Sequence, residues 1–283
     1  FSDAQRQATR EAGEIAGLEV VRIINEPTAA ALAYEAKSEG QKRILVYDLG
    51  GGTFDVSVVS IEDGVVEVLA SHGNNRLGGD DFDHRVVEHL ERHIKREHDY
   101  DIGASRQITA RINRAAESAK RALSDQPFVR IDEEFLFENE GAPVHLSLEL
   151  SRFEYQDMIA DYIDETLEAV HIALSGANLT ASDIDEILLV GGSTRTPIIS
   201  ERLFAEFGKE PQHDIDPDLC VAMGAAIQGG MIAGEEVSAV LVDITPYTYG
   251  TAAIGPLNGE IYPYLYVPII RKNTPLPVTK TEA

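Results

Sequence analysis

Two aspartates flank three consecutive glycines and a threonine in VYDLGGGTFDVSVV, residues 46–59. Glycine is preferred where a chain must adopt a positive φ or let another group approach its backbone closely. Three glycines leave unobstructed backbone N–H groups, which together with the Thr53 hydroxyl can form a concavity for phosphate. Asp48 and Asp55 could then hold a hydrated Mg²⁺ against the phosphates or orient an attacking water. A plain hairpin turn is the alternative, although Asn-Gly or Asp-Gly would suffice for it.

A second glycine turn follows a buried strand in EILLVGGSTRTPII. The small residues Gly191, Gly192 and Ser193 would let a planar ligand pass close to the backbone, and the Arg195 guanidinium could lie over an aromatic base. Pro197 predicts that a helix begins directly after the turn. The alternative is an ordinary strand-to-helix turn with a solvated arginine.

A helix predicted from about residue 107 to 124 supplies a third polar group. Its apolar face holds Ile108, Ile112, Ala115, Ala119 and Leu123. Because successive residues turn by about 100°, the opposite face gathers Glu117, Lys120, Arg121 and Ser124. A solvated face with an i, i+4 pair between Glu117 and Arg121 explains this pattern equally well.

The elements that must position these groups alternate between helix and strand. We predict a helix from Pro27, the two strands around the glycine run, a third strand near VVEVLAS and a helix over DDFDHRVVEHLERHIKREHD capped by Asp81. Strands are expected within residues 128–151, an amphipathic helix over residues 153–177, another helix from Pro217 and a β-like tail rich in Tyr and Pro. The fold class is therefore α/β.

Composition sets limits on the class of protein. With 283 residues, 43% of them hydrophobic, the chain can form two lobes with cores of their own. A formal net charge of −24 argues against binding nucleic acid over a broad face. No run of 18 apolar residues predicts a membrane span. The single Cys220 excludes an internal disulfide framework and fits a reducing, cytoplasmic compartment.

One pair of histidines has the spacing of metal ligands. His89 and His93 are four residues apart on a predicted helix. Two ligands without a third do not make a closed zinc site, so a solvated helix face is the interpretation that we favour.

Taken together, the motifs resemble one family. NEPTAAALAY, DLGGGTFD, GGDDFD, ESAKRALS, VGGSTRTP and DPDLCVAMGAA occur in the order and spacing of the heat-shock protein 70 (DnaK-type) chaperones, over residues 1 to about 250. The resemblance implies an ATPase domain with the actin-like fold that binds ATP or ADP with Mg²⁺. It implies a phosphate loop formed by Asp48, Gly50, Gly51, Gly52, Thr53 and Asp55, with Glu26 reaching the Mg²⁺ through water. The implied adenosine contacts are Glu117, Lys120, Arg121, Ser124, Gly191, Gly192, Ser193 and Arg195, with Asp218 at the nucleotide site.

The resemblance also implies a division of the chain. Residues 1–37 and 213–234 correspond to parts of ATPase lobe I, the latter its closing helix, and residues 38–212 correspond to lobe II, with a subdomain IIB at about 78–155. Residues 235–242 resemble the interdomain linker, and residues 243–283 the start of the β-sandwich substrate domain, although the stretch at 255–270 departs from the usual pattern. We expect a fragment truncated at both ends, because the family's first phosphate loop and catalytic lysine have no counterpart in these residues.

The function that the resemblance implies is an ATP-dependent protein-folding chaperone. In the intact protein, ATP hydrolysis would be coupled through the linker to the binding of unfolded client peptides, with a J-domain co-chaperone and a nucleotide-exchange factor as partners. A small-molecule kinase and a polymerising cytoskeletal protein of the same superfamily are the alternatives. The 283 residues alone are expected to be inactive as an ATPase, and the faces of residues 28–34 and 221–227 are expected to lack the sheet that covers them.

Overall fold

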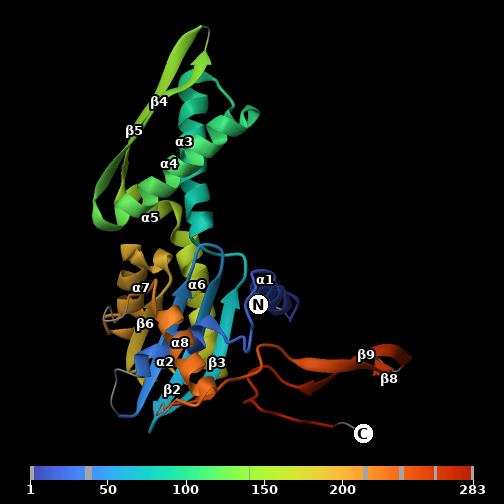
Figure 1. The fold of residues 1–283 in the computed structure, drawn as a ribbon. Coiled ribbons are helices and arrows are strands. Elements are labelled where there is room, and N and C mark those ends of the chain that lie inside the picture. Colours follow the sequence, from blue (N-terminus) through green and yellow to red (C-terminus); the bar gives the residue numbers. More distant parts are fainter. Residues whose placement is uncertain are drawn as a thin grey trace.

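A computed structural model describes residues 3–35, 40–139, 141–212, 216–235, 239–257 and 260–281. Within these ranges the chain forms a central sheet with helices on both faces, an upper unit of helices and one hairpin, and a second hairpin that projects from the body (Figure 1). The α/β class predicted from the sequence is confirmed.

The central sheet has five strands in the order β6-β1-β2-β3-β7. The strands are β1 Lys42–Leu49, β2 Phe54–Glu62, β3 Val65–Asn74, β6 Glu186–Val190 and β7 Val240–Val242. β1 to β3 form an antiparallel meander, whereas β6 pairs with β1 and β7 with β3 in parallel. Residues 44–49 of β1 are buried on both faces, as the continuous apolar run ILVYDL predicts for a central strand. The short strand β7 falls in the segment that we expected to be a linker.

Two helices cover the face of the sheet that is nearer the viewer in Figure 1: α2 Glu26–Glu35 and α8 Cys220–Ala233. Residues 28–34 are at most 9% exposed, so the expectation that they lack a covering sheet is wrong. They pack on β1, β2 and β3, and against α8 so closely that a Cβ at Gly224 would lie 1.7 Å from the Ala29 carbonyl oxygen. The expectation holds only in part for residues 221–227, because Met223 and its neighbours on the outer side of α8 stay exposed.

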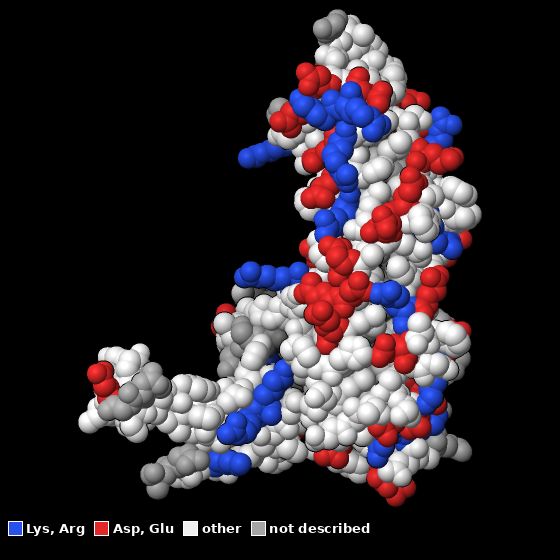
Figure 2. Space-filling model, turned by 180° about the vertical axis from the view of Figure 1, so that it is seen from behind, with Lys and Arg blue, Asp and Glu red and all other residues white. Residues whose placement is uncertain are grey.

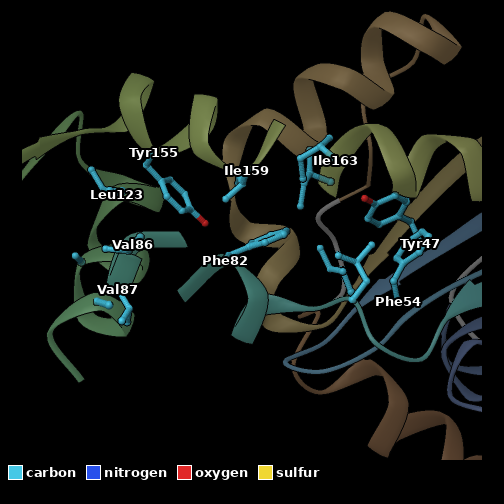
Figure 3. Close-up of a cluster of buried hydrophobic side chains, with 14 of the residues drawn as sticks. Tyr47, Phe54, Phe82, Val86, Val87, Leu123, Tyr155, Ile159 and Ile163 are labelled. Atoms are coloured by element: carbon cyan, nitrogen blue, oxygen red, sulfur yellow. The ribbon is translucent and has the colours of Figure 1, made fainter. Parts of the chain in front are cut away.

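The opposite face of the sheet packs against α6 Ala160–Gly176 and α7 Pro197–Phe207. The upper unit consists of α3 Gly79–His98, α4 Arg106–Asp125, the hairpin of β4 Phe128–Asn139 and β5 Ala142–Ser151, and α5 Arg152–Met158. Its core continues into the core of the sheet: Figure 3 shows Tyr47 and Phe54 at one end of this cluster and Val86 and Leu123 at the other. α1 Asp3–Ile15 lies beside β3, and three short 3₁₀ helices complete the described elements: η1 Ile102–Ala104, η2 Ala181–Asp183 and η3 Gly192–Arg195.

Three helix boundaries differ from the sequence prediction. Asp81 is not the N-cap of α3; Gly78 is, and the Asp81 carboxylate accepts its N–H at 2.8 Å from the third helical position. The single helix predicted over residues 153–177 is divided at Ile159, whose ψ of 3° leaves the helical region, into α5 and α6. The helix predicted from Pro217 begins at Cys220, because residues 217–219 form a turn.

The C-terminal part is a two-stranded hairpin, β8 Tyr249–Leu257 and β9 Glu260–Ile270, that projects from the body (Figure 1). A β-sandwich start at residues 243–283 is not confirmed, since these two strands pair only with each other among the described residues. Each predicted segment has residues outside the described ones: 1–2 and 36–37 of the first lobe I part, 38–39 and 140 of lobe II, 213–215 before α8, 236–238 of the linker, and 258–259 and 282–283 of the predicted substrate domain. Within the described chain, no helix is both long and apolar enough to cross a membrane.

Candidate functional site

The first glycine turn, residues 50–53, joins β1 to β2, and Asp48 and Asp55 lie opposite each other across these strands. None of the three glycines has a positive φ. A Cβ at Gly52 would meet no atom within 4 Å, and one at Gly51 would only touch the Asp80 carboxylate at 3.4 Å. Neither the turn geometry nor crowding by the described residues therefore requires glycine at these two positions. Close approach of a ligand to the backbone remains as the physical reason.

The carboxylate at the base of this turn is buried without a partner. Asp48 is 6% exposed, and its Oδ2 atom accepts no hydrogen bond from any described residue. Burial, followed by the nearby carboxylates of Glu26 and Asp55, raises the pKa of Asp48 to about 7. Burial also raises the pKa of Asp55, to about 6, against the opposing charge of Lys272. An orphaned buried oxygen among three carboxylates fits a nearby hydrated cation.

The manner of cation binding follows from what surrounds these carboxylates. Among the described residues, no three His, Cys, Asp or Glu side chains are arranged to hold a metal ion directly. Mg²⁺ commonly keeps several of its waters and takes one or two carboxylates together with substrate phosphates. Asp48 and Glu26 therefore fit a Mg²⁺ that is held through water.

The second glycine turn leads from β6 through η3 into α7. Gly191 has a φ of +84°, and a Cβ there would lie 2.4 Å from the Leu49 carbonyl oxygen at the end of β1. Pro197 occupies the first turn of α7, as predicted. The Ser193 hydroxyl donates to the Gly50 carbonyl at 2.9 Å. The two glycine turns, which are distant in the sequence, are thus in direct contact.

Arg195 leaves this turn toward two carboxylates. Its guanidinium donates to Asp216 at 3.1 Å and to Asp218 at 2.8 Å, and the arginine side chain is about half exposed. A Cβ at Gly192 would lie 3.2 Å from the same Asp218 side chain. Asp218 therefore lies beside the second turn, as the resemblance implies, and the arginine plane is held by an ion pair.

The polar face of α4 divides into two parts. Lys120 points toward the first turn of α3, where its ammonium donates to the Gly79 carbonyl at 2.9 Å and to Asp83 at 2.8 Å. Arg121 instead pairs with Glu117 at 2.6 Å on the exposed side of the helix. This is the i, i+4 pair that a solvated face would form, so for Arg121 both interpretations stay open. Ser124 is partly buried, and its carbonyl accepts a hydrogen bond from Arg152 at 3.3 Å.

The beginning of α3 ties these groups to the first glycine turn. The Gly79 N–H donates to the Gly50 carbonyl at 2.9 Å, and the Asp80 N–H donates to the Gly51 carbonyl at 2.7 Å. Contact is so close that a Cβ at Gly78 would lie 2.3 Å from the Gly51 carbonyl oxygen. Both glycine turns and Lys120 of α4 therefore meet at one place.

Compared with known protein families, the chain matches the family described as Hsp70 protein, over residues 1–283.

The chain belongs to the Hsp70 family. The resemblance inferred from the motifs is thereby confirmed, and with it the nucleotide-binding chaperone class and the actin-like ATPase fold that the family implies. Hsp70 proteins are ATPases that bind nucleotide with Mg²⁺ and act on client peptides with co-chaperones. The match favours this class over a small-molecule kinase or a cytoskeletal polymer.

Three residues near the site were missed by the sequence interpretation of this Hsp70 chain. Arg6 donates to the Asn25 amide oxygen, and the Asn25 amide donates to Asp243 at 3.0 Å. They line a cavity of about 170 Å³ that Glu26 and Asp55 also reach. Asn25 precedes Glu26 in NEPT, and Asp243 follows β7. These hydrogen bonds therefore connect the residue directly after the expected linker to the residue directly before Glu26. Only the position of Asn25 beside Glu26 could have indicated this.

The segment that follows β9 lies beside the residues that follow β7, the edge strand of the sheet. Residues 273–276 pair with residues 243–245 through backbone hydrogen bonds, among them Thr245 N–H to the Thr274 carbonyl at 2.9 Å. Lys272 contacts His72 of β3 at 3.3 Å, and its charge is one of those that lower the pKa of Asp55. Nothing in the sequence pattern indicated this lysine, because its approach depends on the return of the chain after β9.

Among the described residues, His89 and His93 belong to no group of three or more potential metal ligands. His89 is half-buried, and burial and Arg92 lower its pKa, while His93 contacts Arg96 at 3.2 Å. Figure 2 shows acidic side chains gathered where the upper unit meets the body and basic side chains mainly on the upper unit. Uncharged side chains make up most of the rest of this face. The acidic group separates the basic side chains of the upper unit from those lower on the body, which disfavours binding of a nucleic acid across this face.

Proposed function

We propose that this Hsp70 chain provides most of the second lobe of a chaperone ATPase and binds Mg²⁺ with ATP or ADP on it. The proposal is carried by one observation: the Gly50 carbonyl accepts hydrogen bonds from both the Ser193 hydroxyl and the Gly79 N–H. Through Gly79, which also accepts from Lys120, the two turns and α4 share one small volume. A phosphate chain and a nucleoside are the two parts of a ligand that would need both turns.

The proposed roles follow the chemistry of each group. The turn N–H groups suit phosphate oxygens, whereas the buried carboxylates suit Mg²⁺ and water. Mg²⁺, when bound, would offset the charge of the phosphates. The phosphate-side residues are Asp48, Gly50, Gly51, Gly52, Thr53, Asp55 and Glu26, of which Asp48 and Glu26 hold Mg²⁺ through water. The nucleoside-side residues are Glu117, Lys120, Arg121, Ser124, Gly191, Gly192, Ser193, Arg195 and Asp218.

We further propose the domain division implied by the family. Residues 1–37 and 213–234 belong to lobe I, residues 38–212 to lobe II with its subdomain at about 78–155, residues 235–242 to the linker and residues 243–283 to the start of the substrate domain. The elements from α3 to α5, which rise together above the sheet, support the subdomain boundary. One buried, unpaired Cys220 is compatible with a cytoplasmic location.

The linker would couple nucleotide to client peptides in a chain that carries the complete substrate domain. β7 is held at the sheet edge by β3, and Leu241 packs against the core under α2. Asp243, directly after β7, is hydrogen-bonded to Asn25, the residue before Glu26. A conformational change at the proposed Mg²⁺ site would reach the linker through these contacts. J-domain co-chaperones and exchange factors would act on the same coupling between nucleotide and client peptide.

Calorimetric titration with ADP and Mg²⁺ tests the nucleotide proposal. Arg121→Ala should weaken binding several-fold and leave the unfolding midpoint unchanged, because Arg121 is 76% exposed at its side chain. Arg114→Ala, an exposed arginine two turns earlier on α4, is the matched control and should bind as the unaltered chain does. Equal affinity in all three proteins would return the Glu117–Arg121 pair to a solvated helix face.

The same protein separates binding from catalysis. Phosphoryl transfer requires the γ-phosphate to be held in line and its charge to be offset from several sides. The 283 residues supply one phosphate loop and no counterpart of the family's catalytic lysine, so they should bind nucleotide weakly. Single-turnover hydrolysis should be no faster than in a control without protein. A rate equal to that of a complete chaperone ATPase domain would show that this account is wrong.

The coupling proposal is tested in a longer chain with the complete substrate domain. Replacing Leu241 and Val242 by Asp should abolish ATP-induced peptide release and leave ATP binding intact, because two charges cannot pack at the sheet edge. Val240→Asp is the matched control, since the Val240 side chain is 59% exposed. Release kinetics of a labelled peptide provide the measurement, and normal release from the double variant would exclude the linker as the coupling element.

A further inference from the structure

Lys120 is held from two sides at the boundary between α3 and α4. Its ammonium has three N–H donors, of which one is bonded to the Gly79 carbonyl at 2.9 Å and one to Asp83 Oδ2 at 2.8 Å. The two charged side chains are only 14% and 18% exposed. Because the ammonium is tetrahedral, two fixed acceptors determine the direction of its third N–H.

The Lys120 ammonium lies close to the proposed nucleotide site. A Cβ placed on Gly79 would be 3.1 Å from the Lys120 ammonium and 2.3 Å from the Ser193 hydroxyl. Both side chains therefore flank the same α-carbon. The Ser193 hydroxyl in turn reaches the Gly50 carbonyl of the first glycine turn. A ligand bound beside Ser193 would therefore lie close to the Lys120 ammonium.

Asp83 has no role in the nucleotide site as proposed above. It is partly buried on α3, between the core residue Phe82 and the exposed His84 in the sequence. Its Oδ1 atom is buried and accepts no hydrogen bond from the described residues. Burial raises the pKa of Asp83, and the hydrogen bond from Lys120 opposes that effect. A partly buried ion pair contributes little net stability, because desolvation offsets the attraction. Stabilising the packing of α3 on α4 is therefore a weak explanation for a carboxylate at position 83.

A second polar group approaches Asp83 from α5. The Tyr155 hydroxyl is buried, and it points toward α3 on the side of Phe82 (Figure 3). Burial raises the pKa of Tyr155, a hydrogen bond with Thr196 opposes that effect, and the nearby charge of Asp83 adds to it. The Asp83 carboxylate thus faces Lys120 on one side and an uncharged phenol on another. Lys120 is the cation that it can orient.

We propose that Asp83 is a positioning residue for nucleotide binding, which acts by holding the Lys120 ammonium so that its third N–H points at the nucleoside part of the ligand. The inference rests on the proposed nucleotide site and adds to it a residue that does not touch the ligand. Asp83 would contribute to affinity only through Lys120. It would not affect the phosphate side, which the glycine turn holds by itself.

A double-mutant cycle in the 283-residue chain tests this inference. Affinities for adenosine, ADP and inorganic pyrophosphate are measured by calorimetry for Asp83→Asn, Lys120→Met and the double variant. Asp83→Asn should weaken adenosine and ADP binding about tenfold, the value of one charge-assisted hydrogen bond. Pyrophosphate affinity should stay within twofold. In the Lys120→Met background, Asp83→Asn should have no further effect, since no ammonium remains to be oriented.

Two control variants distinguish positioning from a structural role. Asp83→Glu keeps the charge and should restore part of the lost affinity, and it replaces Asp83→Asn in the cycle if that variant does not fold. Glu88→Gln, a change at a partly exposed carboxylate of α3 that forms ion pairs with His84 and Arg85 of the same helix, should match the unaltered chain. Equal losses for adenosine and pyrophosphate, or additive effects in the cycle, would overturn the positioning role alone. Absence of ADP binding by the unaltered chain would overturn the nucleotide site and this inference with it.

Discussion

The two glycine turns of the site resemble each other in sequence and differ in what glycine does there. At Gly191 the backbone has a φ of +84°, and the β1 carbonyl of Leu49 occupies the space that a Cβ would need. At Gly52 the φ is not positive, and the space is open. The chain itself therefore requires glycine in the second turn. In the first turn, a requirement for glycine has to come from a molecule that binds there.

This difference teaches how structural and functional glycines can be separated. A glycine needed by the fold should be intolerant of alanine before any ligand is added, whereas a glycine needed by a ligand should tolerate alanine until the ligand is added. Two glycine substitutions test the distinction, and a third substitution tests the buried carboxylate beside the first turn; they follow from the largest expected effect to the smallest.

Gly191→Ala should have the largest effect. The new methyl group would lie 2.4 Å from a backbone oxygen in a left-handed conformation, and strain and overpacking together should lower the free energy of unfolding by about 4 kcal/mol. Urea denaturation followed by circular dichroism measures this. Gly229→Ala in α8 is the matched control, because a Cβ there meets nothing within 4 Å and should stabilise the helix by about 0.5–1 kcal/mol. Similar stability of the two variants would contradict the structural role of Gly191.

Asp48→Asn should have the next largest effect, and the effect should depend on pH. The pKa of Asp48 is raised to about 7 in the folded chain, so folding opposes its ionisation and its contribution to stability is lost as the pH rises from about 4 through 7. At pH 8 the asparagine variant should be more stable by up to about 4 kcal/mol, and the gain should vanish near pH 4. Denaturation curves at both pH values measure this. A gain that does not change with pH would show that the buried carboxylate has an ordinary pKa.

Gly52→Ala should have the smallest effect on stability and a distinct effect on binding. We expect the free energy of unfolding to stay within about 0.5 kcal/mol, because the new methyl group meets open space. ADP affinity should fall about tenfold, the loss expected when a backbone N–H can no longer approach a phosphate oxygen. Titration with ADP in the presence of Mg²⁺ measures this. Unchanged affinity would mean that the first turn is an ordinary hairpin.

Much of the fold follows from the sequence because it depends on local periodicity. Phe82, Val86, Leu90 and Ile94 were placed on the buried face of one helix, and all four are buried. The bounds were less predictable: Ile159 interrupts a continuous amphipathic pattern, because its backbone conformation is set by how α5 and α6 pack and not by the residue type. The covering of residues 28–34 depends on contact with α8, nearly 200 residues later.

The site was predictable in its parts, because glycine runs and acidic residues are visible as motifs. Its connections were not. Whether Lys120 turns inward to Asp83 while Arg121 stays outside is decided by the first turn of α3, which no periodicity of α4 reveals. Asn25 and Asp243 meet only because β7 pairs in parallel with β3. Contacts between segments that are distant in the sequence form the part of the site that motifs do not reveal.

The backbone contact between Ala29 of α2 and Gly224 of α8 has a consequence for how the chain matures. α8 is synthesised nearly 200 residues after α2, so one face of the sheet stays incompletely covered until α8 has been added. Non-local contacts of this kind form slowly, because a long loop must close before they stabilise anything. The apolar face under α2 and α8 is therefore the surface on which a nascent chain of this chaperone would itself need protection from aggregation.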